Sequence, residues 1–178
     1  KVSRVSSDER ADCLFIRSAL PLLKYLALLL QKTKTDLSRN LVTLVKQNME
    51  NLICFLFNKI HSPSMDFFDI GGGPLAKKQK LIRECGILSI LVEIVCRAFK
   101  YNPQLMSNLE VNPDLKQVFR LAYTTMRYAI KEYRPNELYL SQWMTMVTEH
   151  SLTTQGSKDI FAGRTLIELI DNNKRILE

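Results

Sequence analysis

Apolar residues recur every three or four positions through most of the chain, which is the spacing of one face of an α-helix. The first periodic segment follows Ser6 and Glu9, which have the spacing of a capping box, so we predict a helix from about Asp8. Pro21 interrupts this segment. Because proline has no N–H to donate, it either kinks the first helix or opens a second one.

The next periodic segment follows Thr35 and Asp36, a typical start signal, and predicts a long helix that ends at about His61. We expect its core-facing residues to be Leu37, Leu41, Leu44, Leu52, Phe55, Leu56 and Ile60. The pattern then breaks from Ser62 to Leu75, where a Gly-Gly-Gly-Pro run predicts a loop that acts as a hinge.

Helical spacing resumes at about Ala76 and is interrupted at Gly86, where we predict a bend before a second apolar helix over 87–100. A polar connection follows, and it leads into another long periodic segment. Asn112 or Asp114 can cap this helix, because either side chain can accept a hydrogen bond from a backbone N–H of the first turn.

That long helix is predicted to end at about Tyr133. Pro135 suits the first turn of another helix, which runs to about Glu149, because the first turn does not need the N–H that proline lacks. A linker rich in Ser, Thr and Gly comes next. Two short helical pieces are predicted after it, at 165–170 and 173–178.

Nowhere do polar and apolar residues alternate over the length of a strand, and helix follows helix with short polar connectors. These features predict an all-α fold, an armadillo-like stack of helical pairs. No clean repeat of about 30 to 45 residues is visible, so the array would be a degenerate one. We expect one domain spanning 1–178, with the loop hinge at 62–75, and a chain that begins with Lys1 is expected to be a fragment of a larger protein.

The chain carries a formal net charge of +7, with 46% hydrophobic and 24% charged residues. This charge favours anionic partners, although solubility alone also explains it. Basic and aromatic residues do not alternate, so nucleic acid is not an expected partner. The longest apolar run, Ala19 to Leu30, contains Pro21 and Lys24 and is too short to span a bilayer, so we expect no membrane-spanning segment.

Residues with catalytic or metal-binding chemistry are few and scattered. His61 and His150 have no neighbour at the spacing of a metal-binding pair, and we predict surface or capping roles for both. The four cysteines are widely spaced, unlike a zinc set or a disulfide framework. The glycines at 71–73 lack the second glycine and the Lys-Ser/Thr pair of a nucleotide phosphate loop. The sequence therefore predicts no enzyme, no metal site and no cofactor.

One short segment, residues 76–85, concentrates positive charge on a predicted helix. Its cations are Lys77, Lys78, Lys80 and Arg83. They crowd the first turns, where the helix dipole disfavours cations unless an anion is present. Lys80 and Arg83 share one helix face, and Tyr133 and Arg134 form a second cationic spot much later in the chain. On the residues alone, the cluster is either a solvated helix face or a phosphate site.

Three segments resemble, in the same order and at similar spacing, the first RIH domain of inositol 1,4,5-trisphosphate receptors. They are K-Q-K-L-I-R-E-C-G-I-L from Lys78, Y-R-P-N-E-L-Y from Tyr133 and D-N-N-K-R-I-L-E from Asp171. The resemblance covers about Leu75 to Glu178, and the residues before it only in helical character. In that family the domain is an armadillo-like helical half of the ligand-binding core of a tetrameric calcium-release channel, and ryanodine receptors share a broader form of it.

In the family, the phosphates are held by an Arg-x-x-x-Lys-x-x-Arg helix face and a Tyr-Arg-Lys triplet, together with residues of a neighbouring β-trefoil domain. The resemblance assigns phosphate binding in this chain to Lys80, Arg83, Tyr133 and Arg134. Ala76 stands in place of the first arginine and Pro135 in place of the triplet's lysine. Losing two charged contacts would weaken binding by roughly a hundred- to ten-thousandfold. Lys77, beside Ala76, is an auxiliary candidate for one of them.

The resemblance thus implies a non-enzymatic module that senses an inositol phosphate and couples it to channel gating. The implied partners are the inositol phosphate, an adjacent β-trefoil domain and other domains of a homotetrameric channel at the cytosolic face of the endoplasmic reticulum membrane. As an isolated fragment, the chain is expected to bind the ligand weakly or not at all. The alternative is an armadillo-like scaffold for protein contacts that binds no ligand.

Overall fold

The structure is a computed structural model that describes residues 6–33, 36–153 and 160–177, with side chains as far as Asp171. Within these residues it consists of nine α-helices and one short 3-10 helix, and it contains no β-strand. The predicted all-α class is confirmed. In chain order the helices are α1 (Ser7–Leu30), α2 (Arg39–Phe57), α3 (Ala76–Glu84), α4 (Ile87–Tyr101), α5 (Pro103–Ser107), η1 (Leu109–Val111), α6 (Pro113–Ile130), α7 (Arg134–Ser141), α8 (Met144–Leu152) and α9 (Ala162–Leu177).

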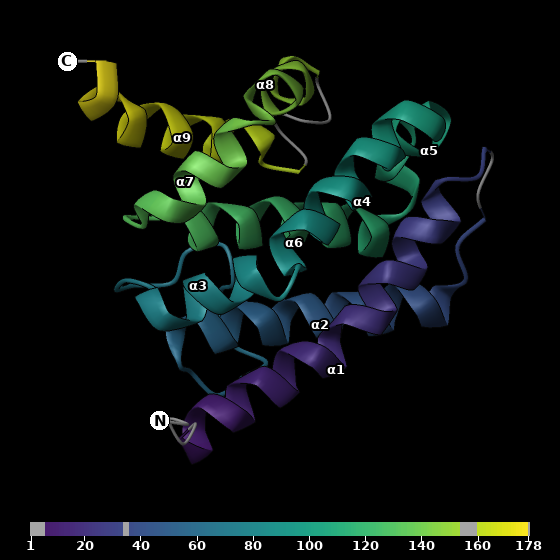
Figure 1. The fold of residues 1–178 in the computed structure, drawn as a ribbon. Coiled ribbons are helices and arrows are strands. Elements are labelled where there is room, and N and C mark those ends of the chain that lie inside the picture. The colour runs from purple at the N-terminus through teal and green to yellow at the C-terminus, as the bar shows by residue number, and fades with distance from the viewer. Residues whose placement is uncertain (1–5, 34–35, 154–159, 178) are drawn as a thin grey trace.

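Helix α6 lies at the centre of the molecule (Figure 1). Helix α2 packs along one side of it, and α4 and α9 also pack against it. Helix α1 packs on α2 and α4 at the edge of the molecule that lies away from α8 and α9 (Figure 1). The short helix α3 contacts α4, α6 and α7. The helices therefore form packed layers around α6, and their armadillo-like pairing stays a prediction.

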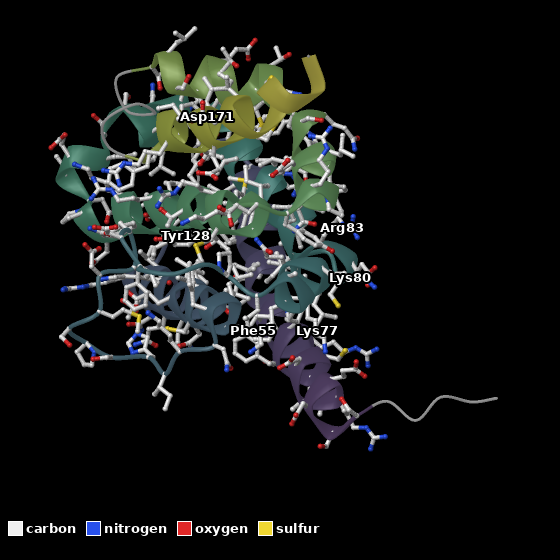
Figure 2. All side chains as sticks on the ribbon, turned by 90° about the vertical axis from the view of Figure 1, so that its left-hand side faces the viewer. Phe55, Lys77, Lys80, Arg83, Tyr128 and Asp171 are labelled. Atoms are coloured by element: carbon white, nitrogen blue, oxygen red, sulfur yellow. The ribbon has the colours of Figure 1, made fainter. Side chains whose placement is uncertain are left out.

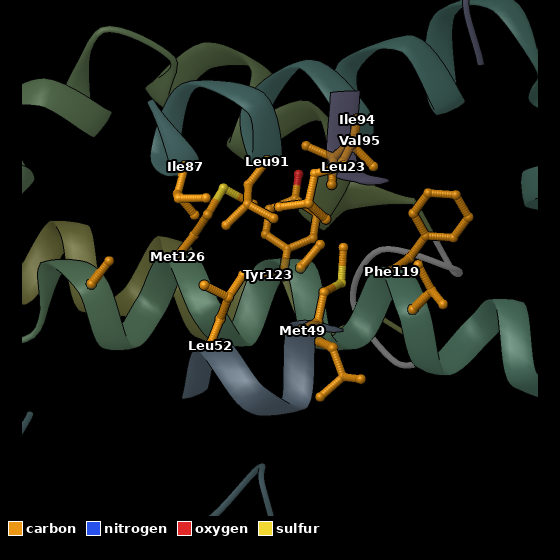
Figure 3. Close-up of a cluster of buried hydrophobic side chains, with 14 of the residues drawn as sticks. Leu23, Met49, Leu52, Ile87, Leu91, Ile94, Val95, Phe119, Tyr123 and Met126 are labelled. Atoms are coloured by element: carbon orange, nitrogen blue, oxygen red, sulfur yellow. The ribbon is translucent and has the colours of Figure 1, made fainter. Parts of the chain in front are cut away.

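A continuous cluster of buried apolar side chains connects the layers. At its centre, Tyr123 and Met126 of α6 lie together with Leu23, Met49 and Leu91 from three other helices (Figure 3). Twelve of the eighteen residues of α6 are buried. A fully buried large apolar side chain contributes about 1.5–3 kcal/mol to the stability of the fold. With so many buried residues, α6 is the helix on which the others are assembled.

Helix α1 begins with the predicted capping box. The Ser6 Oγ accepts a hydrogen bond from the Glu9 N–H at 3.2 Å, and the Glu9 Oε2 accepts one from the Ser6 N–H at 3.3 Å. The helix then runs unbroken through Pro21 to Leu30, so the alternative of a second helix opening at Pro21 is wrong. Pro21 lies on the exposed side of α1, where a carbonyl left without its helical donor can reach water.

By length and composition, α1 is the one described helix that could cross a membrane. A core helix passes the same test, and one side of α1 is packed into the core. The buried residues of that side are Ile16, Ala19, Leu23, Leu26, Ala27 and Leu30. Most of these buried residues lie in the second half of α1, and only Ile16 belongs to the first half.

Helix α2 begins later and ends earlier than predicted. Ser38 caps it, because its Oγ accepts a backbone N–H of the first turn at 3.2 Å, so the start signal at Asp36 is wrong. Thr35 lies outside the described residues. The helix stops before Asn58, which adopts a left-handed φ of 52°, and does not continue to His61. Asparagine tolerates this conformation better than most residues, which explains why the helix ends there.

The predicted register of α2 is partly wrong. Leu52, Phe55 and Leu56 are buried as expected, but Leu44 faces solvent, and Ile60 lies beyond the helix and is 91% exposed. The inward positions that the predicted register missed are Val42, Val45, Met49 and Ile53. Apolar residues occupy more than one side of this helix, so contact with α6 decides which side is buried.

The loop over 62–75 is non-helical, as predicted. Its first part is anchored on α6 by a buried phenol, because the Tyr128 Oη donates to the Phe67 carbonyl at 2.9 Å and accepts from the Ile70 N–H at 3.3 Å. Phe67 and Ile70 are themselves buried. The part of the loop before its glycines is therefore held to α6, and hinge motion stays a prediction.

Gly86 forms the predicted bend between α3 and α4, with a left-handed φ of 85°. An added Cβ would meet no atom within 4 Å, so the cost of a side chain there is backbone strain alone. We expect Gly86→Ala to lower the free energy of unfolding by about 1 kcal/mol. Gly163→Ala, at an equally open position in α9, is the control and should be neutral or stabilising. Urea unfolding measures both, and equal losses would contradict the explanation.

The two candidate caps of α6 are now distinguished. Asn112 is the cap, because its Oδ1 accepts a hydrogen bond from the N–H of Leu115 at 3.2 Å. Asp114 lies in the first turn of the helix, where its negative charge suits the helix dipole. The helix ends at Ile130 and not at the predicted Tyr133.

Pro135 lies in the first turn of α7, as predicted. The single helix expected to reach Glu149 is wrong, because α7 and α8 are separate helices with a break at residues 142–143. The two short pieces predicted at 165–170 and 173–178 are also wrong, since α9 is one continuous helix. Much of the predicted linker, residues 154–159, lies outside the described residues.

The two histidines have different environments. His61 is exposed, in keeping with its predicted surface role, and its Nε2 lies 2.9 Å from the Glu50 Oε2. The predicted surface or capping role of His150 is wrong, because its ring is buried. It stacks on Phe99 with 3.8 Å between centroids, and its Nδ1 lies 2.5 Å from the Tyr123 Oη. Packing of α8 against the rest of the fold therefore buries an imidazole.

Candidate anion-binding site

Helix α3 carries the basic cluster at the surface of the molecule (Figure 2). The helix follows Leu75 without a side-chain cap, and its first turn contains no acidic residue. Lys77 and Lys80 are exposed and Arg83 is partly buried, and all three lie on the same side of the molecule (Figure 2). Because the N-terminus of a helix is itself positive, this surface attracts anions.

Lys78 belongs to the same cluster in sequence but has a different role. Its Nζ donates to the Asn58 Oδ1 at 3.1 Å and lies 3.9 Å from the Asp12 Oδ1. The same Nζ lies 4.5 Å from the centroid of the Phe55 ring. With its side chain only 13% exposed, Lys78 ties the start of α3 to α1 and to the end of α2. The cluster therefore consists of one structural lysine and three outward cations.

Two buried side-chain amides join α3 to the turn between α6 and α7. The Gln79 Nε2 donates to the carbonyls of Tyr128 and Lys131, each at 2.9 Å. The Asn136 Nδ2 donates to the carbonyls of Gln79 and Ala129, each at 2.8 Å. Three of these four acceptors lie at the end of α6, where a helix leaves its carbonyls without partners. We call this pair of side chains, Gln79 and Asn136, the amide lock.

The amide lock brings the two predicted cationic spots onto adjoining elements. Gln79 directly precedes Lys80 on α3, and Asn136 follows Arg134 in the first turn of α7. Tyr133 is the residue that precedes α7, with an extended backbone at φ −130° and ψ 93°. The predicted ligands of α3 and those at the start of α7 therefore lie on two segments that buried hydrogen bonds hold together.

Carboxylates accompany the predicted ligands. The Glu84 Oε1 lies 3.9 Å from the Lys80 Nζ and 3.7 Å from the Arg83 Nη2. The Arg134 Nη1 lies 3.5 Å from the Oε2 of Glu137, whose side chain is buried. Exposed ion pairs contribute about 0–1 kcal/mol, so a phosphate can compete with Glu84 for the α3 cations. Removing the cationic partner of a buried carboxylate costs more free energy than removing that of an exposed one. Arg134 is therefore the least available of the three cations for a phosphate.

Lys77 and Tyr133 differ from the other candidates. In the part of the chain that the structure describes, neither side chain has a hydrogen-bonding or ionic partner. An exposed ammonium and a partly buried phenol are both donors that an anion can use. Ala76 and Pro135, which stand where the family resemblance implies cations, lie in the first turns of α3 and α7.

The hydrogen-bond partners of the amide lock could not be predicted from the sequence, although one of its two side chains carries a sequence signal. Gln79 lies three positions before the buried Ile82, so the two share the inner face of α3. A polar side chain on a buried face must find hydrogen-bond partners, which marks Gln79 as a structural residue. Nothing comparable marks Asn136, whose two acceptors are backbone carbonyls.

A sequence model of the RIH domain matches residues 46–178, which is well over half of the chain. The chain belongs to the RIH domain family. This family takes its name from ryanodine and inositol trisphosphate receptors, which are intracellular receptor channels, and it is not a family of enzymes. The matched part of the RIH domain begins within α2 and includes the amide lock and the basic face of α3, whereas α1 precedes it.

Proposed function

We propose that this RIH domain is the helical half of the ligand-binding core of an inositol trisphosphate receptor-like calcium-release channel. Its phosphate ligands in this proposal are Lys80, Arg83, Tyr133 and Arg134, with Lys77 as an auxiliary cation. The observation that supports the proposal is the amide lock, which holds α3 to the turn between α6 and α7. A site held in place before the ligand arrives loses less entropy when it binds.

The proposed ligands differ in what they offer a phosphate. A phosphate monoester carries about 1.5 to 2 negative charges and three acceptor oxygens. Arg83 can donate two parallel N–H bonds to one phosphate, whereas Lys80 supplies a point charge. Tyr133 adds a neutral O–H donor. Glu84 is half-exposed, so its carboxylate returns to water at little cost when the phosphate takes its place.

The site in this chain is incomplete by itself. Ala76 and Pro135 remove two charged contacts that the family resemblance implies, and each such contact contributes about 1.5–3 kcal/mol. An adjacent β-trefoil domain would supply the other side of the pocket. We therefore infer weak binding by this chain alone, and a complete site in a homotetrameric channel at the cytosolic face of the endoplasmic reticulum membrane.

Movement of α3 would reach the rest of the domain through three connections. Lys78 ties its start to α1 and α2, Gly86 joins its end to α4, and the amide lock ties its middle to α6. A ligand that draws α3 toward a neighbouring domain would therefore displace the core helices together. This is the coupling of ligand to gating that we propose for the domain.

Inositol 1,4,5-trisphosphate titrated into this chain should bind weakly, and Arg83→Glu should weaken that binding by about tenfold or more. The substitution removes a charged donor and adds a repulsive carboxylate. Isothermal titration calorimetry at low salt measures the effect. Lys100→Glu is the matched control, because it makes the same change of charge near the far end of α4, where the Lys100 Nζ lies over the Tyr101 ring. The affinity of Lys100→Glu for inositol 1,4,5-trisphosphate should equal that of the unmodified chain.

The second candidate function is a helical scaffold that binds protein and no inositol phosphate. Two observations favour it: Ala76 and Pro135 occupy the positions of family cations, and Glu84 and Glu137 already partner the cations that remain. The same titration separates the two functions. Absence of heat at high micromolar ligand when the chain is joined to the adjacent β-trefoil domain, or identical binding heat for Arg83→Glu and the unmodified chain, would exclude the ligand-binding proposal and support the scaffold.

A further inference from the structure

Helix α1 lies at the edge of the molecule, with one side in the core and the other uncovered (Figure 1). On the uncovered side Leu14, Tyr25 and Leu28 are 61%, 52% and 60% exposed, and Pro21 is exposed between them. Leu14, Pro21 and Leu28 recur every seven residues, which is two helical turns. Tyr25 lies four residues after Pro21 and so belongs to the same face. These four residues form one narrow apolar stripe, the α1 seam.

A column of cations runs beside the α1 seam. Arg10, Arg17 and Lys24 are all exposed and recur with the same seven-residue spacing. Within the described residues, none of the three has an ion-pair partner. A nearby carboxylate of the same helix, that of Asp12, is directed to Lys78 instead. The outer side of α1 therefore presents an apolar stripe and a positive stripe in parallel, with no negative stripe to match.

We propose that the outer side of α1 docks an acidic amphipathic helix of a partner protein. The apolar side of that helix packs on the α1 seam, and its carboxylates face the cation column. A seven-residue repeat is the period at which two α-helices wind around each other, so both stripes keep facing the same partner helix along the length of α1. Complementary charge beside such a seam decides which partner is accepted.

The other occupants fit these features less well. A helix that lies in a membrane surface needs a broad apolar side, whereas the α1 seam is a narrow stripe, because six other apolar residues of α1 are buried in the core and Phe15, Leu20 and Leu22 pack against it. A second copy of this chain would offer an identical face, which has a column of cations and no column of carboxylates. Like charges in register oppose such pairing. Charge complementarity therefore favours an acidic helix from another protein.

Pro21 adds a polar feature to the α1 seam. Because proline has no N–H, the carbonyl of Arg17, one turn earlier, lacks its helical donor. This carbonyl lies one turn before the exposed Pro21 of the seam, so it can accept a hydrogen bond from a partner side chain. A Gln or Asn of the partner helix at this point would satisfy it.

A designed peptide provides the test, because the natural partner is not identified. The probe is a fluorescent helix of about 21 residues, three heptads, with Leu at the seam positions and Glu at the flanking positions. Fluorescence anisotropy follows its binding to the whole chain. A matched peptide carries Lys in place of every Glu. We expect binding of the Glu peptide alone, and its affinity should fall as salt rises from about 50 to about 500 mM.

Reversal of the cation column supplies the decisive comparison. The double variant Arg17→Glu with Lys24→Glu should bind the Glu peptide at least about tenfold more weakly and should gain affinity for the Lys peptide. A variant with a damaged fold would lose affinity for the Glu peptide but would not gain affinity for the Lys peptide. Lys100→Glu, with an exposed cation on another helix, is the control and should bind the Glu peptide like the unmodified chain. Arg83→Glu should also leave this binding unchanged, which separates the surface from the phosphate site.

Three results would overturn the proposal. Equal affinity for the Glu and Lys peptides would show that charge does not select the partner. Binding to vesicles of phosphatidylcholine and phosphatidylserine without binding of the Glu peptide would assign the surface to a membrane. Dimerisation of the chain that Leu14→Ser with Leu28→Ser abolishes, again without binding of the Glu peptide, would assign it to a second copy.

Discussion

Asn136→Leu is expected to lower the free energy of unfolding by about 3 kcal/mol. Leucine has the same number of side-chain non-hydrogen atoms as asparagine and the same branching at Cγ, but it cannot donate to the carbonyls of Gln79 and Ala129. Because the site is fully buried, water cannot replace the lost donors, and each unsatisfied group costs about 1–3 kcal/mol. Urea unfolding followed by circular dichroism measures the loss.

The control for Asn136→Leu is Asn51→Leu, the same replacement at an exposed position of α2. Its effect should stay within about 0.5 kcal/mol, as for most surface changes. Gln79→Leu should behave like Asn136→Leu, because it removes the donors to Tyr128 and Lys131 at the end of α6. A loss below about 1 kcal/mol for Asn136→Leu would show that the amide lock does not hold α3 to α7.

The free energy of unfolding should also fall by about 2 kcal/mol between pH 6.5 and pH 5, and by about 3 kcal/mol in total by pH 4, because of His150. Burial lowers the pKa of His150 to about 4, from an ordinary value of 6.5. Between these two pKa values the unfolded chain binds a proton that the folded chain does not. Acid therefore stabilises the unfolded state, and the stability of the fold decreases as the pH decreases through this window.

The surroundings of His150 explain why its ring stays neutral. Burial raises the pKa of the Tyr123 phenol, so Tyr123 remains protonated, and its Oη shares a hydrogen bond with the His150 Nδ1. Burial away from water disfavours the charged form of the His150 ring. Phe99 covers one face of the ring, so water cannot solvate the cation.

Urea unfolding at several pH values between 7 and 4 measures this dependence. His150→Gln should lose most of the slope, because glutamine does not titrate, although the variant will be less stable at pH 7 through poorer packing. His61→Gln, at an exposed position, should keep the full slope. The same slope in His150→Gln and in the unmodified chain would assign the pH dependence to other groups.

Local signals in the sequence predicted the helices well where the decisive residues lie within one turn of each other. The capping box of Ser6 and Glu9 and the left-handed Gly86 are of this kind, and both are confirmed. The errors arose where two local signals compete. Asp36 and Ser38 are both good caps, and only the second is used. Ile60 continues the apolar period of α2, yet Asn58 ends the helix before it.

For the candidate site, the sequence predicted only which residues share one face of the helix. The three-residue spacing of Lys80 and Arg83 places them on one face of α3 in the sequence and in the structure alike. Their sequence neighbour Lys78 could not be told apart from them, because its partners Asn58 and Asp12 come from other helices. Whether the predicted residues bind an inositol phosphate stays a prediction.

The helical class, the starts of most helices and the resemblance to RIH domains could all be predicted from the sequence. Apolar period and capping depend on residues within a few positions of one another, so they can be read along the chain. Which sides of the helices are covered depends on how the helices pack together. Three of the four hydrogen bonds of the amide lock join residues 49 to 57 positions apart, Tyr123 meets His150 across 27 positions, and the α1 seam stays outside the core. Burial of a side chain depends on segments far away in sequence, and no local pattern records which of them will cover it.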